Sequence, residues 1–199
     1  MHSVNWNTMC ERYGLNKEAL DKQIEASGLQ PSDGTWLAGG ALRRTIAGKP
    51  LTSDLDFFFR DQGTYDHARL LVEAKGLKLA RENDFNQTWH AELDGKVLPV
   101  QLIKNWFYED AERLIDSFDF TICQLAFDGE QLYLGPFTLW DIARHRLTMH
   151  KVNYGASTVR RLLKYTKQGY TACQGTFVTL LKQIADDPSR IQGAVEYVN

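Results

Sequence analysis

A pair of glycines followed by a pair of aspartates constrains this chain more than any other feature. The segment TWLAGG begins as a short apolar and aromatic run and ends in Gly39 and Gly40. It is followed by ALRRTIAG, a run of good helix formers closed by Gly48. Thirteen residues separate Gly40 from Asp54, which opens the acidic and then aromatic stretch DLDFFFR. The pattern predicts a strand, a glycine turn, a helix and a second, buried strand that carries Asp54 and Asp56.

The glycines and aspartates suit the two ends of one substrate. Residues two apart on a strand share a face with Cα atoms about 6.5 Å apart, so Asp54 and Asp56 present both carboxylates to one point. These hard oxygen ligands suit Mg²⁺, which fills its shell with waters and substrate phosphates. Gly39 and Gly40 let a phosphate approach backbone N–H groups at the start of a helix. A nucleoside triphosphate would complete such a site. Two arginines one turn into the helix are placed to add positive charge: Arg43 and Arg44.

Hydrophobic periodicity predicts the elements around this segment. Helices are expected over 16–27, 65–75 and 109–117, and the stretches LKLARE, TWHAEL and KVLPVQLI are expected to form a β-meander. DFTICQLAFDG is expected to be a strand, and the chain beyond it to be helical almost to residue 199. The expected core includes Cys123, the aromatic run 57–59, Trp36, Trp89, Trp106 and Trp140.

Composition narrows the class of protein and its environment. A formal net charge of −2 gives no whole-molecule attraction to nucleic acid or membrane, and no apolar run approaches the length of a membrane span. Three scattered cysteines without a CxxC pair argue against a disulfide framework or a structural zinc site. We therefore expect a cytoplasmic protein without membrane contact.

One region departs from this even balance. Between Asp141 and Lys167 seven basic residues stand against a single acid. If the later ones share a helix, Arg160, Lys164 and Lys167 lie on one face, with Arg161 offset. Together with interleaved tyrosines, this face would suit a triphosphate or single-stranded nucleic acid, while an ordinary solvated face is the alternative interpretation.

GGALRR followed by DLDFFF resembles the signature of the DNA polymerase β-like nucleotidyltransferase superfamily. The resemblance is to the head region of bacterial-type CCA-adding enzymes and poly(A) polymerases. FDFTICQLAFDG is similar to their RRDFTINALAYDG segment, and YLGPFTLWDIARHRL to their DPFGG stretch and its sequel. STVRRLLKYTKQGY stands where their EDPLRILRAARF helix would be, so the resemblance covers roughly residues 36–170.

The resemblance implies an α+β fold. Residues 1–135 would form a nucleotidyltransferase palm, a mixed β-sheet flanked by helices, and 136–199 a small helical region packed with it as one unit. It implies that Asp54 and Asp56 are the catalytic metal ligands for Mg²⁺ or Mn²⁺, and that Gly39 and Gly40 form the phosphate-binding turn. Asp119 matches the ribose-contacting aspartate, although anchoring its own strand is an equally good interpretation. Three further residues stand near the base-recognising helix: Arg160, Arg161 and Lys164.

One departure from the family pattern leads to two hypotheses about function. The family's third carboxylate belongs on the strand near 97–103, where the aligned residue is Gln101, and Glu92 would take its place only in a different register. The first hypothesis is a nucleotidyltransferase that moves a nucleoside monophosphate from a nucleoside triphosphate to a hydroxyl. The favoured acceptor is an RNA or tRNA 3′ end, and a protein acceptor is an alternative. The second hypothesis is a weakened relative that binds nucleotide or RNA, or acts as an interaction module.

Overall fold

The computed structural model describes residues 2–191, which fall into two compact units. The first unit comprises the chain up to residue 116 together with 124–135. The second comprises residues 117–123 and the chain from 136 onward. The boundary between the units lies near residue 135, with one exception: the short segment 117–123 belongs with the second unit.

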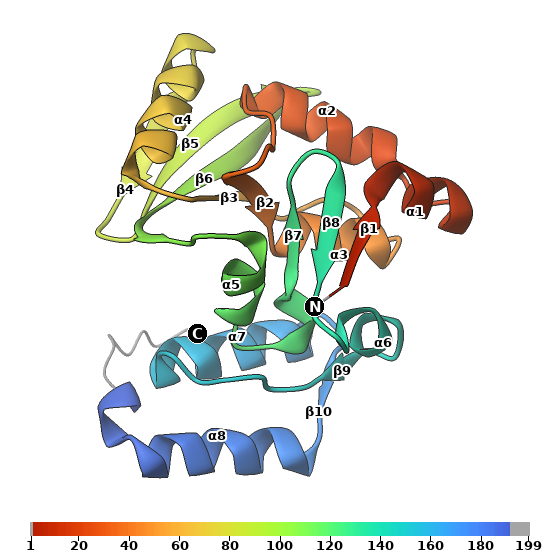
Figure 1. Ribbon diagram of the computed structural model, residues 1–199, viewed down its shortest axis with the longest axis vertical. Coiled ribbons are helices and arrows are strands. Elements are labelled where there is room, and N and C mark those ends of the chain that lie inside the picture. Colours follow the sequence, from red (N-terminus) through yellow and green to blue (C-terminus); the bar gives the residue numbers. More distant parts are fainter. Residues whose placement is uncertain (1, 192–199) are drawn as a thin grey trace. The chain divides into compact units, whose positions relative to one another are not determined.

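A mixed eight-stranded sheet forms the first unit, in the order β1-β8-β7-β2-β3-β6-β5-β4 (Figure 1). β3 and β6 run parallel, and the other neighbouring strands run antiparallel. The strands are β1 His2–Asn5, β2 Thr35–Ala38, β3 Leu55–Phe59, β4 Lys78–Glu82, β5 Asn86–Leu93, β6 Lys96–Phe107, β7 Leu125–Phe127 and β8 Gln131–Leu134. The expected meander is confirmed in β4, β5 and β6, and the fold class is the expected α+β palm.

Five helices accompany this sheet in the described part of the first unit: α1 Trp6–Tyr13, α2 Lys17–Ser27, α3 Gly40–Ile46, α4 Gln62–Ala74 and α5 Ala111–Asp116. α2 ends at Gly28 in the left-handed conformation, and α4 begins at Asp61, whose side chain accepts from the Thr64 N–H. The sequence patterns predicted all but α1, which follows the equally unpredicted edge strand β1. No helix within residues 2–191 has the length and apolar character needed to cross a membrane.

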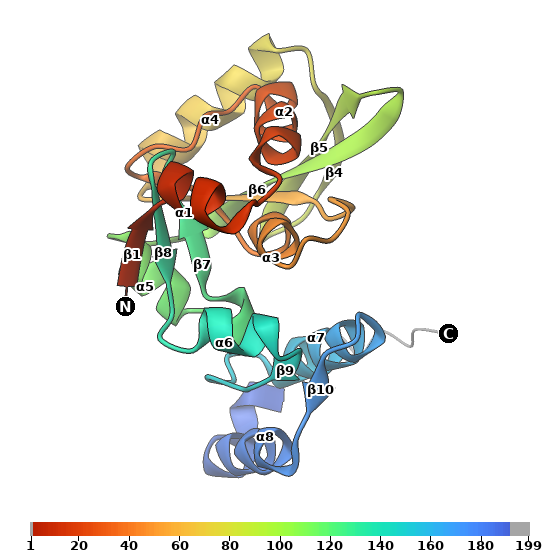
Figure 2. The same ribbon diagram turned by 90° about the vertical axis from the view of Figure 1, so that its right-hand side faces the viewer.

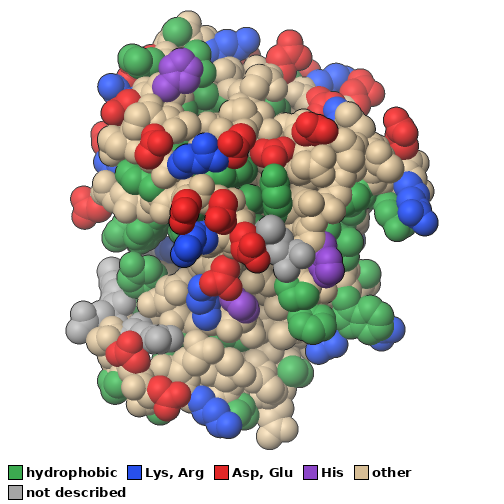
Figure 3. Space-filling view, in the orientation of Figure 1, with side chains coloured by type: hydrophobic (Ala, Val, Ile, Leu, Met, Phe, Trp, Pro, Cys, Tyr) green, Lys and Arg blue, Asp and Glu red, His purple; other side chains and the backbone are tan. Residues whose placement is uncertain are grey.

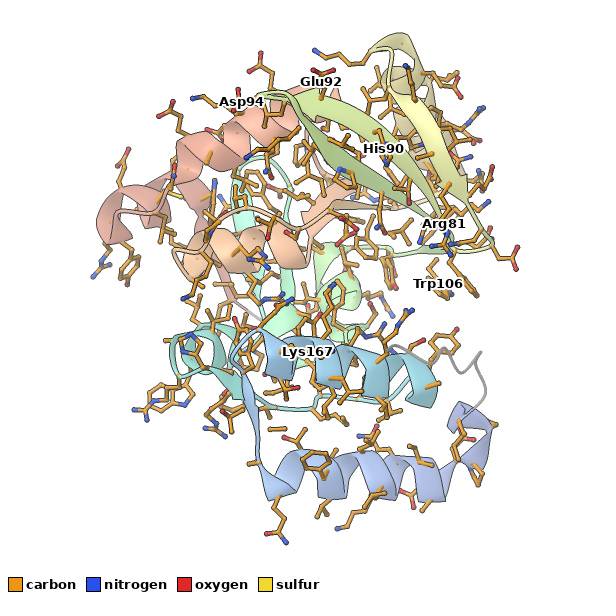
Figure 4. The ribbon with its side chains drawn as sticks, turned by 180° about the vertical axis from the view of Figure 1, so that it is seen from behind. Arg81, His90, Glu92, Asp94, Trp106 and Lys167 are labelled. Carbon is orange, nitrogen blue, oxygen red and sulfur yellow. The ribbon has the colours of Figure 1, made fainter. Side chains whose placement is uncertain are left out.

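The central strands have two unlike faces. In β3 the side chains of Leu55, Phe57 and Phe59 are buried, whereas Asp56 and Phe58 between them are half-exposed. α4 packs against the apolar side, where Tyr65 meets Phe59 edge-on at 5.5 Å between ring centroids. Figure 1 shows α4 lying across β4–β6, and the opposite face is seen from behind in Figure 4. We call that opposite face, which carries Asp56, the open face.

Helices dominate the second unit. It contains α6 Thr138–Ala143, α7 Gly155–Lys167, α8 Gln174–Asp186, the two-residue strands β9 Arg146–Leu147 and β10 Thr171–Ala172, and the 3₁₀ turns Thr121–Cys123 and Pro188–Ile191. β10 lies between α7 and α8 along the chain and pairs with β9 in parallel (Figure 2). Cys123 is buried as expected, and its Sγ lies 3.1 Å from the hydroxyl of Tyr165.

Three expectations from the sequence are wrong. DFTICQLAFDG is not one strand, because the Cys123 N–H bonds back to the Phe120 carbonyl in a 3₁₀ turn and β7 begins only afterwards. The chain beyond it is not simply helical, since β8 joins the sheet between β7 and β1, and residues 192–199 lie outside the described residues. Trp106 and Trp140 are not core residues but are 36% and 53% exposed.

The exposure of Trp140 belongs to a wider patch. Figure 3 shows apolar side chains gathered over α6, where Phe137, Leu139 and Trp140 are exposed. The guanidinium of Arg144 lies 4.0 Å from the ring centroid of Trp140. The neighbouring arginine therefore covers one side of this tryptophan in place of a core.

Candidate active site

Two carboxylates mark the start of the second central strand. Asp54 directly precedes β3 and Asp56 lies within it, and both side chains are half-buried. Strand alternation gives them the same face, with Cα atoms about 6.5 Å apart. The structure thus brings the two predicted metal-ligating residues together on the open face.

The glycine turn lies directly against Asp56. Gly39 has φ 77° and ψ −127°, a conformation that L side chains rarely adopt, and a Cβ added there would lie 3.3 Å from Asp56 Oδ2. At Gly40 an added Cβ would lie 3.0 Å from Cβ of Ser53. Glycine is favoured at the first position by backbone conformation, and a side chain at either position would crowd its neighbour. The turn and the carboxylates therefore form one continuous surface.

Gln101 occupies the place of the expected third carboxylate. It is paired with Asp56 in the β3–β6 register, and its Nε2 donates to Asp54 Oδ2 at 2.5 Å. Glu92 does not take its place, because it pairs with Val97 while Gln101 pairs with Thr88. Four residues along a strand correspond to about 13 Å, so Glu92 lies at the far end of the hairpin. The third position is therefore filled by a neutral amide.

The two arginines that follow the glycine turn contact other parts of the protein. The side chain of Arg43 is buried, and Arg44 donates from Nη1 to the carbonyl oxygen of Pro50 at 3.1 Å. The Arg44 contact holds the loop that leads from α3 to Asp54. Arg44 therefore stabilises the loop between α3 and β3.

The remaining predicted residues belong to the second unit, where two of them form a pair. Asp119 is 3% exposed, and its Oδ2 accepts from Arg161 Nε on α7 at 2.5 Å. Its backbone carbonyl also accepts the N–H groups of His150 and Lys151. Burial raises the pKa of the Asp119 carboxyl above its ordinary value, and the charge of Arg161 opposes this rise. The contacts support the anchoring interpretation of Asp119.

The basic face predicted from sequence lies on a single helix. α7 carries Arg160, Lys164 and Lys167 with exposed side chains, while Arg161 is half-buried against Asp119. As expected from its offset, Arg161 points away from the other three: it pairs with Asp119, and they are exposed.

The donor set suits a divalent cation. Asp54 and Asp56 offer carboxylate oxygens from one face, which is the ligand type that Mg²⁺ prefers. The Oγ of Ser53 is buried beside the glycine turn and has no hydrogen-bond partner among the described residues. A buried hydroxyl without a partner is costly, and a ligand at the turn would supply one. Sequence reasoning missed Ser53, because only the folded loop brings it next to Gly40.

Comparison with known proteins places the chain in a family. The model described as "Gad2: Gabija anti-defense 2 family protein" matches residues 13–145. The chain belongs to the Gabija anti-defense 2 family. A curated relative, Gabija anti-defense 2 of Bacillus phage SPbetaL7, is 26% identical over 164 residues, which cover 75% of this chain and 37% of the relative. This member of the family therefore spans little more than a third of that relative's length.

Solved structures show the fold of this Gabija anti-defense 2 family member. A CCA-adding enzyme in complex with ATP superimposes with a TM-score of 0.66 at 13% identity, over 96% of this chain and 49% of the enzyme. The Thermotoga maritima CCA-adding enzyme complexed with tRNA gives a TM-score of 0.60 at 13% identity, over 94% and 46% of the two chains. The chain thus has the nucleotidyltransferase fold of CCA-adding enzyme heads, as the resemblance in GGALRR and DLDFFF implied.

Proposed function

We propose that this protein is a Mg²⁺-dependent nucleotidyltransferase that moves a nucleoside monophosphate from a nucleoside triphosphate to a hydroxyl, with an RNA 3′ end as the favoured acceptor. The observation that carries the proposal is the contact between the glycine turn and Asp56, with Asp54 on the same face. Carboxylates for cations and a side-chain-free turn for phosphates meet there on one surface.

The residues of the chain have distinct tasks in this reaction. Asp54 and Asp56 would hold Mg²⁺, which when bound supplies positive charge to the triphosphate and to the attacking hydroxyl. The turn at Gly39 and Gly40 packs closely against Asp56 and Ser53, and without side chains of its own it would let phosphate oxygens approach its backbone N–H groups. Ser53 Oγ is positioned beside the turn to donate to such an oxygen. Catalysis then rests on positioning and charge neutralisation.

The second unit has a basic face of its own. The exposed cations of α7, Arg160, Lys164 and Lys167, would attract a triphosphate or single-stranded nucleic acid to that unit, whereas Asp119 and Arg161 hold α7 in place within it. A protein hydroxyl is the alternative acceptor. The name of the phage relative connects the family with opposition to a defense, and a transferase would act there by modifying its target.

Gln101 favours a second candidate function. An amide that donates to Asp54 occupies the position from which a third acid would help to hold a cation. In this second candidate the protein keeps the fold and binds a nucleotide, an RNA end or another protein without turnover.

A titration and an incorporation assay separate the two candidates. We expect calorimetry to show ATP binding that requires Mg²⁺ and is lost in Asp56→Asn, and labelled nucleotide to be incorporated into RNA by the wild type only. Asp66→Asn, an exposed aspartate on α4, is the matched control and should behave as the wild type. Binding that survives both chelation and Asp56→Asn would contradict the transferase and support the binding protein.

Restoring the third acid tests the same question from the other side. Gln101→Glu keeps the size of the side chain but replaces the amide donor by an oxygen, next to two carboxylates. We expect incorporation to rise about tenfold, since a charge placed at a metal site changes rates by this order or more. Unchanged incorporation in a variant that still binds ATP would show that the third position does not limit the reaction.

A further inference from the structure

The open face continues from the carboxylates across three further strands. Asp56 pairs with Gln101, Gln101 with Thr88, and Thr88 with Arg81, so these four residues form one row from β3 to β4. Paired residues in a sheet share a face, and neighbouring strands lie about 4.8 Å apart, which puts Arg81 about 14 Å from Asp56 along the row. The face thus links the proposed catalytic end to the edge strand.

Positive charge lies at the edge of this face. A second row runs from Pro99 through His90 to Lys78, and the side chains of His90, Lys78 and Arg81 are exposed. Within residues 2–191, neither Lys78 nor Arg81 makes an ion pair, whereas Glu82 on the opposite face pairs with Lys104. Their charge is therefore directed to solvent and not neutralised inside the protein.

A stacked aromatic pair adjoins Arg81. The rings of Phe85 and Trp106 lie 4.8 Å apart and are nearly parallel, at 9°, and the residues are 49% and 36% exposed. Phe85 belongs to the β4–β5 turn that follows Glu82, and the Lys104 N–H donates to its carbonyl oxygen. Figure 4 shows Arg81 and Trp106 at one end of the hairpin strands and the acidic Glu92 and Asp94 at the other. The β4–β6 hairpins are therefore basic and aromatic at one end and acidic at the other.

We propose that the open face of β4–β6 binds the single-stranded 3′ segment of an RNA acceptor, with bases stacked at the Phe85–Trp106 pair and phosphates at Arg81, Lys78 and His90. The combination of exposed aromatics and unpaired cations is what single-stranded nucleic acid requires. The acids at the far end disfavour phosphate there, and the row of paired residues leads from Arg81 to Asp56. This inference rests on the proposed transferase function, since it supplies the acceptor for that site.

The test measures binding of a short single-stranded RNA, labelled at its 5′ end, by fluorescence anisotropy at several salt concentrations in EDTA. Each lost phosphate contact lowers the slope of log affinity against log salt by about 0.7, so Lys78→Ala with Arg81→Ala should lower it by about 1.4. We expect at least a tenfold loss of affinity at low salt. Trp106→Ala should weaken binding with little change of slope, because stacking involves no counterions.

The control has the same change in net charge on other surfaces. Lys22→Ala with Arg69→Ala removes two cations that pair with Glu18 and Glu73 on α2 and α4. If the wild type fails to bind this RNA, or if Lys78→Ala with Arg81→Ala matches the control in affinity and slope, the inference is overturned. The proposed function fails separately, if the wild type shows no Mg²⁺-dependent ATP binding. Lys78→Ala with Arg81→Ala should leave that binding intact, because Asp54 and Asp56 are unchanged.

Discussion

The two units differ in what holds them together. In the first, the central strands bury an apolar layer so completely that Leu37, Leu55, Phe57 and Leu102 have no exposed surface. In the second, helices α6, α7 and α8 each leave a large apolar side chain more than half exposed, in Trp140, Leu163 and Leu181.

Buried polar contacts have a larger part in the second unit. Thr121 Oγ1 donates to Asp141 at 2.6 Å, Thr176 Oγ1 donates to the Leu147 carbonyl at 2.6 Å, and Asp119 accepts from Arg161. The first unit is thus stabilised mainly by the apolar layer of its sheet, and the second depends more on buried hydrogen bonds. Substitutions in the two units should therefore fail in different ways.

The largest effect is expected where the first unit is most tightly packed. Phe57→Ala removes a ring that is fully buried in β3, and we expect a loss of about 3–5 kcal/mol in the free energy of unfolding. Urea denaturation followed by tryptophan fluorescence measures this loss. A change below about 1 kcal/mol would mean that the layer between β3 and α4 repacks easily, and the first unit would then not depend on tight apolar packing.

A smaller effect is expected for the ion pair of the second unit. Arg161→Ala leaves the buried carboxylate of Asp119 without its cation, and we expect a loss of about 2–3 kcal/mol at neutral pH, the half-exposed arginine limiting the cost. The double variant Asp119→Asn with Arg161→Leu removes the charge as well and should recover part of the stability. Equal losses in the single and double variants would show that the charge is not the cause.

The pH dependence of this loss follows from the pKa of Asp119. Burial raises its folded-state pKa above the ordinary 3.8, and removing Arg161 removes the charge that opposes the rise. The folded state then binds the proton more readily than the unfolded state, so the contribution of Asp119 is fully present below the unfolded pKa and is lost as pH rises through the folded one. The deficit of Arg161→Ala should accordingly shrink as pH falls toward 3.8.

The difference between the units also explains what the sequence could predict. Alternation in DLDFFF and the glycine pair are local signals, and they sufficed to predict β2, α3, β3 and the shared face of Asp54 and Asp56. The strand that carries Gln101 could be predicted by spacing, but the hydrogen bond of its amide to Asp54 depends on the β3–β6 register. Ser53 likewise joins the site only through tertiary contact.

Where the sequence failed, a single local event broke a regular pattern. Trp106 follows Asn105, whose φ of 66° interrupts the alternation of β6 and lets the ring leave the core. The segment around Thr121 has strand-like composition, but the Thr121 N–H bonds to the Thr148 carbonyl and its hydroxyl to Asp141, and these partners are distant in sequence. Such nonlocal polar contacts are not visible in periodicity.

The smallest effect is expected on the exposed apolar side of the second unit. Leu181 on α8 is 66% exposed, so Leu181→Ser removes little buried surface and should change the free energy of unfolding by no more than about 0.5 kcal/mol. Leu180→Ser, its buried neighbour on the same helix, is the matched comparison and should cost several times as much. The pair of variants measures directly whether α8 has a buried side and a solvent side. A large loss at Leu181 that depends on protein concentration would instead show that this side of α8 is covered by a second copy in solution. The second unit would then gain through association part of the stability that the first unit gains from its own core.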